Sequence, residues 1–266
     1  AGFYGRFDER VDAEAAVLRS SGTTLVLGDI PPLAFAAAAR AGVPSAAIGN
    51  FTWDWIYEAY PEFERDAPGV VETIRGAYRQ ATRTLRLPMH GGFAAMAHVV
   101  DIPMIARRST RARGETRARL AVPDDRPLVV GSFSDGLDVA FEEIARRERL
   151  TVLSPFAALP APLAYPDLVA AADVVVSKPG YGIVSECAAN GTPLLYTSRG
   201  RFVEYDVFVA EMPRVVRCRF IPQDDLRAGR WRPYIDALLA QPEPDERPRV
   251  DGGQVAAERV LKMLQA

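Results

Sequence analysis

Residues 173–206 contain the pattern with the clearest chemical meaning. The apolar run Val174–Val176 is typical of a buried parallel strand, and the glycine-bearing turn SKPGYG follows it directly. The helix predicted after this turn carries Glu186 in its second turn. The free N–H groups and the dipole at the start of such a helix favour an anion such as a diphosphate, and an acid one turn further on can bind two ribose hydroxyls. The pattern therefore predicts half of a nucleotide-sugar site.

The charged side chains around this turn have predicted roles of their own. Lys178 is one of two lysines in an arginine-dominated chain, which favours a compact charge beside the diphosphate, and Arg201 is the other candidate for that role. Glu204 is expected to hydrogen-bond the donor sugar. A structural alternative stays open, in which Lys178 is a chance survivor and Glu186 only complements the helix dipole. The full set of predicted donor-site residues is Ser132, Lys178, Gly180, Tyr181, Gly182, Ser185, Glu186, Arg201 and Glu204.

A second cluster, NFTWDWIY at 50–57, follows the strand predicted at 45–48, where open α/β sheets bind ligands. Trp53 and Tyr57 are one helical turn apart and could form a wall on which a sugar stacks, and Asp54 could act as a general base. In the alternative interpretation Phe51, Trp55 and Tyr60 pack the domain and Asp54 starts a helix. The predicted acceptor-side residues are Asn50, Trp53, Asp54 and Tyr57, and Asp54 is the one candidate for a catalytic residue.

The glycine turn and its surroundings resemble the donor-binding motif of GT-B glycosyltransferases, above all the bacterial UDP-N-acetylglucosamine transferases that build peptidoglycan precursors. The matching pieces are Gly180, Gly182, the Val184-Ser185-Glu186 helix start and the Gly191-Thr192-Pro193 turn. The resemblance implies two Rossmann-like domains with parallel sheets and a donor site in the second domain. In related transferases a glycine-rich loop also faces the diphosphate. Here its place is taken by SFSDG at 132–136, whose Asp-Gly pair is equally typical of a plain turn.

A wider resemblance covers nearly the whole chain. The segments at 28–60, 178–186, 229–239 and 251–261 are similar to the glycosyltransferase-like N-terminal half of plant L-arabinokinases and to its bacterial stand-alone homologues. The aromatic run NFTWDWIY is the most specific piece. The resemblance implies a GT-B fold and not a kinase, because the kinase chemistry of those plant proteins belongs to a separate domain.

That family opens with a strand and a glycine/histidine loop of the type GHGFGH, whereas this chain starts at Ala1 in a segment that matches a later helix. We therefore expect the first domain to be incomplete and the loop that commonly carries the catalytic base to be missing. A fragment of this kind is expected to bind a nucleotide and to transfer sugar poorly.

Composition narrows the classes of function. The chain has 266 residues and a net charge of −2, which favours no nucleic-acid partner. The locally basic stretch Arg107–Arg119 lacks interleaved aromatic residues, and we interpret it as an exposed linker and helix start. Two cysteines and two histidines show no metal-ligand spacing. No membrane span or signal peptide is visible, so the cytoplasm is the expected location.

Alternating strand and helix signals predict an α/β protein of two domains, 1–105 and 106–266, and the resemblance to GT-B folds implies that the last helix crosses back to the first domain. Gly91, Gly92 and Pro103 are expected to interrupt the stretch after the helix at 70–80. Predicted helices lie at 8–20, 32–40, 70–80, 115–120 and 253–265, and predicted strands at 23–27, 45–48, 99–100, 127–131, 174–176 and 193–196.

The predicted function is transfer of a sugar from a nucleotide diphosphate sugar, UDP-linked by resemblance, to a sugar or lipid-linked acceptor, without a tightly bound cofactor or metal. Two alternatives stay open: a nucleotide-sugar 2-epimerase, for which His90 is the nearby histidine, and a non-catalytic sugar-binding module.

Overall fold

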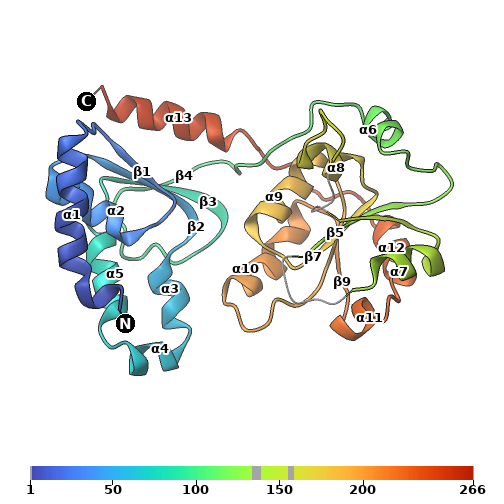
Figure 1. Cartoon of the computed structure of the whole chain (residues 1–266), viewed down its shortest axis with the longest axis horizontal. Coiled ribbons are helices and arrows are strands. Elements are labelled where there is room, and N and C mark those ends of the chain that lie inside the picture. The colour runs from blue at the N-terminus through green and yellow to red at the C-terminus, as the bar shows by residue number, and fades with distance from the viewer. Residues whose placement is uncertain (1, 134–138, 155–158, 266) are drawn as a thin grey trace. The chain divides into compact units, whose positions relative to one another are not determined.

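The computed structural model describes residues 2–133, 139–154 and 159–265. The chain divides into two compact units, which Figure 1 shows as separate bodies. Unit 1 consists of Ala1–Met104 together with Asp251–Ala266, and unit 2 consists of Ile105–Val250. Each unit is built around one parallel sheet, which confirms the predicted α/β class.

Unit 1 contains a four-stranded sheet in the order β1-β2-β3-β4, with every neighbouring pair parallel. Helices α1, α2 and α5 pack on one another beside the sheet (Figure 1). The elements are α1 (Phe7–Ser20), β1 (Val26–Gly28), α2 (Pro32–Ala41), β2 (Ser45–Phe51), α3 (Trp53–Glu58), α4 (Pro61–Asp66), α5 (Val70–Tyr78), β3 (Arg83–Gly91), β4 (Val99–Asp101) and α13 (Gly252–Met263).

The predicted helix at 32–40 matches α2 closely because its sequence carries both boundaries. Pro32 occupies the first helical position, where its missing N–H costs nothing, and Gly42 ends the helix in the left-handed conformation with φ 75°. The apolar side of α2 enters a core in which Phe35, Ile74 and Tyr78 are fully buried. The helix is therefore fixed by its caps and by its packing.

Strand β3 is the main correction to the sequence-based prediction, which interpreted this stretch as interrupted. From Leu85 to Met89 its residues alternate, with Leu85, Leu87 and Met89 buried and the residues between them partly exposed, and Thr84 is buried as well. Pro88, which argues against an inner strand, lies where the pairing with β2 skips from Arg86 to Gly91. A proline is tolerated at such an irregularity because no ladder hydrogen bond is needed there.

Unit 2 contains a five-stranded parallel sheet in the order β6-β5-β7-β8-β9. Its core joins the inner strands to Trp231, which is fully buried and donates its indole N–H to the carbonyl of Leu226 at 2.9 Å. The elements are α6 (Arg113–Arg119), β5 (Leu128–Ser132), α7 (Phe141–Glu148), β6 (Thr151–Leu153), α8 (Tyr165–Ala171), β7 (Val174–Ser177), α9 (Tyr181–Asn190), β8 (Leu194–Tyr196), α10 (Glu204–Glu211), β9 (Cys218–Phe220), α11 (Gln223–Arg227) and α12 (Arg232–Leu239).

The packing at the end of β3 gives a test of the fold of unit 1. A Cβ atom at Gly91 would lie 2.2 Å from Cη2 of Trp55, closer than any real contact. Gly91→Ala should therefore lower the free energy of unfolding by ~1–3 kcal/mol, the scale of overpacking. The control is Gly76→Ala in α5, where a Cβ would meet no described atom within 4 Å and alanine should stabilise by ~0.5–1 kcal/mol. Urea unfolding of both variants measures the difference, and equal stability of the two would contradict the packing described here.

Candidate functional site

The sheet of unit 2 reverses its direction of growth between β5 and β7. From β5 the chain passes to β6 on one side, then returns and continues through β7, β8 and β9 on the other side. Open α/β sheets bind ligands outside the carboxyl ends of the strands at such a reversal. Ser132 ends β5 and Ser177 ends β7, and the two residues are direct partners in the ladder. The topology alone therefore places a candidate site beside Ser132, Ser177 and the glycine turn.

Helix α9 begins at this point, and its N-terminus is open. Gly180 is the N-cap residue, no described side chain caps the helix, and the first backbone bond runs from Val184 N to the carbonyl of Gly180 at 3.0 Å. The N–H groups of the first turn, with the positive end of the helix dipole, therefore face outward as an anion site. A Cβ at Gly182 would meet no described atom within 4 Å, so space is available in front of the turn.

Arg199, which the sequence analysis did not assign to the site, lies against the glycine turn. Its Nη1 is 3.2 Å from the carbonyl oxygen of Pro179 and 3.3 Å from Oε2 of the buried Glu204, and a Cβ at Gly180 would come within 3.2 Å of it. The guanidinium also covers the ring of Phe202, 4.4 Å from its centroid. The position of Arg199 could have been predicted from the sequence, because Arg199 follows β8, the neighbour of β7, and therefore lies at the same edge of the sheet.

The other predicted residues of this loop have different surroundings. Arg201 is exposed, and the half-buried Lys178 accepts a hydrogen bond from Ser177 Oγ at its backbone carbonyl at 3.0 Å. Glu204 is buried in the first turn of α10 beside Arg199. Their predicted contacts with a donor stay predictions.

Ser132, at the end of β5, forms hydrogen bonds with two neighbouring residues. Its carbonyl accepts a hydrogen bond from Ser177 Oγ at 2.7 Å, and its Oγ lies 3.3 Å from the hydroxyl of Tyr165 at the start of α8. Residues 134–136 of the predicted phosphate loop at 132–136 lie outside the described residues. Tyr165 was not predicted as a site residue, although its position at the first turn of a helix at this edge points to it.

Along α9, the predicted donor residues separate into two groups. Ser185 donates its hydroxyl to the carbonyl of Gly182 at 3.0 Å and is buried within the helix. Tyr181 accepts a hydrogen bond from the N–H of Ile105 at 3.1 Å, and burial raises the pKa of its phenol to about 12. Glu186 is buried and forms an ion pair with Arg107, with 2.5 Å between Oε1 and Nε. Ser185 and Tyr181 therefore make hydrogen bonds within the protein, whereas Glu186 pairs with Arg107 next to the candidate site.

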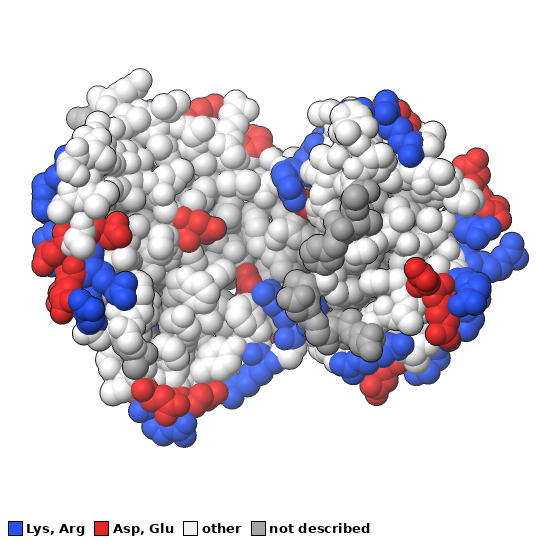
Figure 2. Space-filling view, viewed as in Figure 1, with Lys and Arg blue, Asp and Glu red and all other residues white. Residues whose placement is uncertain are grey.

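The basic stretch Arg107–Arg119 is largely exposed and contains helix α6, in agreement with the predicted linker and helix start. Several of its arginines nevertheless form ion pairs: Arg107 pairs with Glu186, Arg111 with Asp167, and Arg113 and Arg117 both with Asp173. Charged side chains of both signs also lie on the face of each unit that Figure 2 shows. The ion pairs were not predicted, because composition shows an excess of arginine but not the acids, about 50 to 80 positions later, that these arginines meet.

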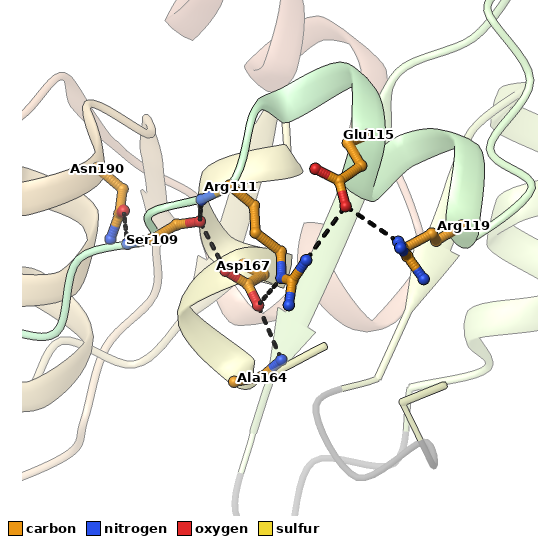
Figure 3. Close-up of polar contacts among 7 residues, drawn as sticks. All are labelled: Ser109, Arg111, Glu115, Arg119, Ala164, Asp167 and Asn190. Carbon is orange, nitrogen blue, oxygen red and sulfur yellow. Dashed lines mark hydrogen bonds and ion pairs between the residues drawn. The ribbon is translucent and has the colours of Figure 1, made fainter. Parts of the chain in front are cut away.

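Figure 3 shows the contacts of Asp167, whose carboxylate interacts with three donors. Its Oδ1 accepts from Ser109 Oγ at 2.6 Å, and its Oδ2 accepts from the N–H of Ala164 at 2.9 Å and lies 3.5 Å from Nε of Arg111. Glu115 bridges Arg111 and Arg119 on α6. Burial raises the pKa of Asp167, but the bonds from Ser109, Ala164 and Arg111 outweigh it, so the pKa lies below its usual range.

The predicted acceptor residues all belong to unit 1, at the end of β2 and in α3. Asn50 is buried and donates to the carbonyl of Met89 at 3.3 Å, across the irregularity in β3. Asp54 is 3% exposed, and its Oδ2 pairs with Nε of Arg75 at 3.3 Å. Trp53 stacks on Tyr57 at 5.5 Å between ring centroids, and Tyr57 stacks in turn on Phe63.

These contacts show that the two aromatic side chains predicted to form a sugar-stacking wall also pack within unit 1. Trp53 and Tyr57 are partly buried against the core of unit 1, and Asp54 lies in the first turn of α3. The role of Asp54 as a base stays a prediction.

The described residues contain no group of three or more His, Cys, Asp or Glu side chains that could hold a metal ion. Within the same part of the chain, no helix combines the length and the apolar character needed to cross a membrane.

Comparison with known proteins supports the architecture. No family model matches the chain. L-Arabinokinase of Arabidopsis thaliana is 29% identical over 267 residues, which cover 94% of this chain, and the chain spans 25% of that relative's length.

Solved glycosyltransferases share the fold at low identity. VinC, solved in complex with DTDP, has a TM-score of 0.52 and 18% identity, covering 96% of this chain and 71% of its own. The kitacinnamycin glycotransferase has a TM-score of 0.54 and 16% identity, with 98% and 80% covered, and the calicheamicin glycosyltransferase CalG4 has 0.53 and 16%, with 96% and 72% covered. The chain has a GT-B-like fold and is related to L-arabinokinase. The predicted GT-B resemblance is thereby confirmed at the level of fold, and the predicted similarity to L-arabinokinase is confirmed over 94% of this chain.

The bonds of Asp167 generate a pH-dependent prediction. Because its folded pKa is lowered, its contribution to stability is present above the unfolded value of about 3.9 and is lost as the pH falls through the folded pKa. Asp167→Asn should lower the free energy of unfolding at pH 7 by ~1–3 kcal/mol, since its amide group would meet donors. The exposed pair Arg232–Asp236 supplies the control Asp236→Asn, with an effect of at most ~0.5 kcal/mol. Denaturant unfolding at pH 7 and below pH 4 measures both variants, and a deficit of Asp167→Asn that persists in acid would contradict the assignment.

Proposed function

We propose that this chain binds a nucleotide diphosphate sugar at the carboxyl ends of β5 and β7 and transfers the sugar to an acceptor. The observation that carries the proposal is the N-terminus of α9, which no described side chain caps and which lies where the sheet changes its direction of growth. Gly182 lies in the first turn of this helix with open space around it, and Arg199 lies beside the turn before it. The GT-B-like fold and the relationship to L-arabinokinase support a sugar-handling role.

The diphosphate is the part of the donor that this site fits best. Its charge would meet the N–H groups of the first turn of α9, and the Arg199 guanidinium lies within 3.3 Å of the turn and of Glu204. During transfer, negative charge grows on the departing diphosphate, and donors already fixed in place stabilise it without reorganisation. VinC was solved with DTDP, which supports a nucleoside diphosphate as the ligand class.

The finer assignments belong to the proposal as well. The donor is a UDP-linked sugar by resemblance, Glu186 binds its ribose, and Glu204 contacts its sugar. The acceptor is a sugar or a lipid-linked sugar, and the expected compartment is the cytoplasm.

Binding is tested by closing the space in front of α9. Gly182→Val should weaken UDP or dTDP binding at least about tenfold, because loss of even one charge-assisted hydrogen bond costs ~1.5–3 kcal/mol. The matched control is Gly253→Val, because Gly253 is also the second residue of a helix and a Cβ there would meet no described atom within 4 Å. Titration calorimetry gives the affinities, and circular dichroism checks that both variants fold. An affinity that is unchanged in folded Gly182→Val would remove the diphosphate from this turn.

Arg199 gives a second, independent test of the same site. Arg199→Met should reduce the affinity for UDP by ~10- to 100-fold and leave the affinity for uridine unchanged, because the guanidinium is proposed to contact only the diphosphate. Arg227→Met, at an exposed arginine of α11 that bonds only Gln223 within its own helix, serves as the control. Equal losses for UDP and uridine would argue that Arg199 acts on the fold of the loop instead.

Turnover of radiolabelled UDP- and dTDP-sugars separates the candidate functions. Label moved to an acceptor supports the transferase, a changed sugar on the same nucleotide supports the epimerase, and tight binding with neither product supports a binding module.

A further inference from the structure

Glu186 and Arg107 form an ion pair of very unequal exposure. The side chain of Glu186 is 6% exposed and that of Arg107 is 66% exposed, with Nε and Oε1 2.5 Å apart. A carboxylate this deeply buried is costly to keep charged without a cation. The positive charge of the exposed Arg107 therefore compensates the negative charge of the buried Glu186.

Hydrogen bonds connect the backbone around Arg107 to both ends of α9. The N–H of Ile105 donates to Tyr181 Oη at 3.1 Å, and Asn190 accepts from the N–H of Ser109 at 2.9 Å while it donates to the carbonyl of Arg107 at 3.1 Å. The Arg107 guanidinium also lies 5.7 Å from the ring centroid of Tyr165, which suits a cation–π contact. Arg107 is thus held beside Glu186 from three directions.

A ribose needs a carboxylate that is both ionised and correctly aimed. An ionised carboxylate offers about four acceptor positions, whereas a protonated one carries a donor in place of an acceptor. Arg107 contacts Oε1 through a single nitrogen, so further acceptor positions of the group remain for ligand hydroxyls.

We propose that Arg107 is a positioning residue for nucleotide recognition, which holds Glu186 ionised and oriented so that it accepts hydrogen bonds from the ribose hydroxyls. This inference rests on the proposed function, because it concerns how the ribose of the same donor is recognised.

Removing the arginine changes the acid–base behaviour of the site in a definite direction. The ionisable groups around Glu186 are Arg107, Tyr165 from α8 and the adjacent Cys187, and burial raises the pKa of both Tyr165 and Cys187. Both therefore stay neutral between pH 5 and 8. Without Arg107, burial disfavours the charged form of Glu186, so ribose recognition should weaken as the pH falls. A structural contact alone produces no such pH dependence.

The experiment compares UDP with 2′,3′-dideoxy-UDP, which lacks both ribose hydroxyls, by calorimetry at pH 6.0 and 8.0. The wild type is expected to prefer UDP by ~10-fold at both pH values, the scale of a charged hydrogen bond. Arg107→Met should lose most of this preference at pH 6.0 and regain part of it at pH 8.0, and Arg107→Lys should retain it. Arg113→Met is the matched control, because Arg113 pairs with Asp173, just before β7 at the opposite edge of the sheet.

The outcomes separate this inference from the proposed function. A wild type that binds UDP no better than the dideoxy compound, or binds neither, overturns the ribose role of Glu186 and this inference with it. A normal wild type with an unchanged, pH-independent preference in Arg107→Met overturns this inference alone.

A double variant keeps the test decisive if Arg107→Met fails to fold. Glu186→Gln removes the buried charge, and the preference in Arg107→Met/Glu186→Gln should equal that in Glu186→Gln alone. A further loss in the double variant would mean that Arg107 contacts the ligand directly, which contradicts a role exerted through Glu186.

Discussion

Three carboxylates in the second unit, Glu186, Asp167 and Asp173, constrain its fold through one short segment. They belong to α9, to α8 and to the residue before β7, and the segment 107–117 gives each of them a cation. Glu186 and Asp167 are buried, so removing the cation from either of them leaves a buried charge uncompensated. The path of this segment over α8 and α9 is therefore set by electrostatics as much as by apolar packing.

The same network makes the N-termini of two neighbouring helices differ. Helices α8 and α9 both begin at the carboxyl edge of the sheet, but Asp167 accepts the N–H of Ala164 and so satisfies the start of α8 with its own carboxylate. No described side chain does this for α9, which begins with glycine. An N-terminus of that kind keeps its donors and its dipole for an anion from outside.

The sequence predicted what is encoded locally. The strand before the glycine turn, the caps of α2 and the glycines of the candidate site follow from residue type and short-range spacing, and they appear in the structure at the predicted positions. Strand β3 was not predicted because Gly91, Gly92 and Pro103 were expected to interrupt this stretch, and only the pairing with β2 shows a strand that extends to Gly91. The ion-pair partners of Arg107–Arg117 were missed because these contacts join segments that only the fold brings together.

Each unit has a glycine near the junction of a strand and the following helix, and the surroundings of the two glycines differ. In unit 1, a Cβ at Gly28, the last residue of β1, would come within 3.0 Å of Pro31 and 3.2 Å of Phe35, so the glycine lets the chain's own side chains close over the strand end. Helix α2 then starts at Pro32, whose nitrogen offers no N–H to an anion. In unit 2, a Cβ at Gly182, in the first turn of α9, would meet no described atom within 4 Å, and the Arg199 guanidinium lies beside the turn before it. A glycine near the end of a strand therefore favours a binding role only when the protein does not fill the space it leaves and hydrogen-bond donors surround it.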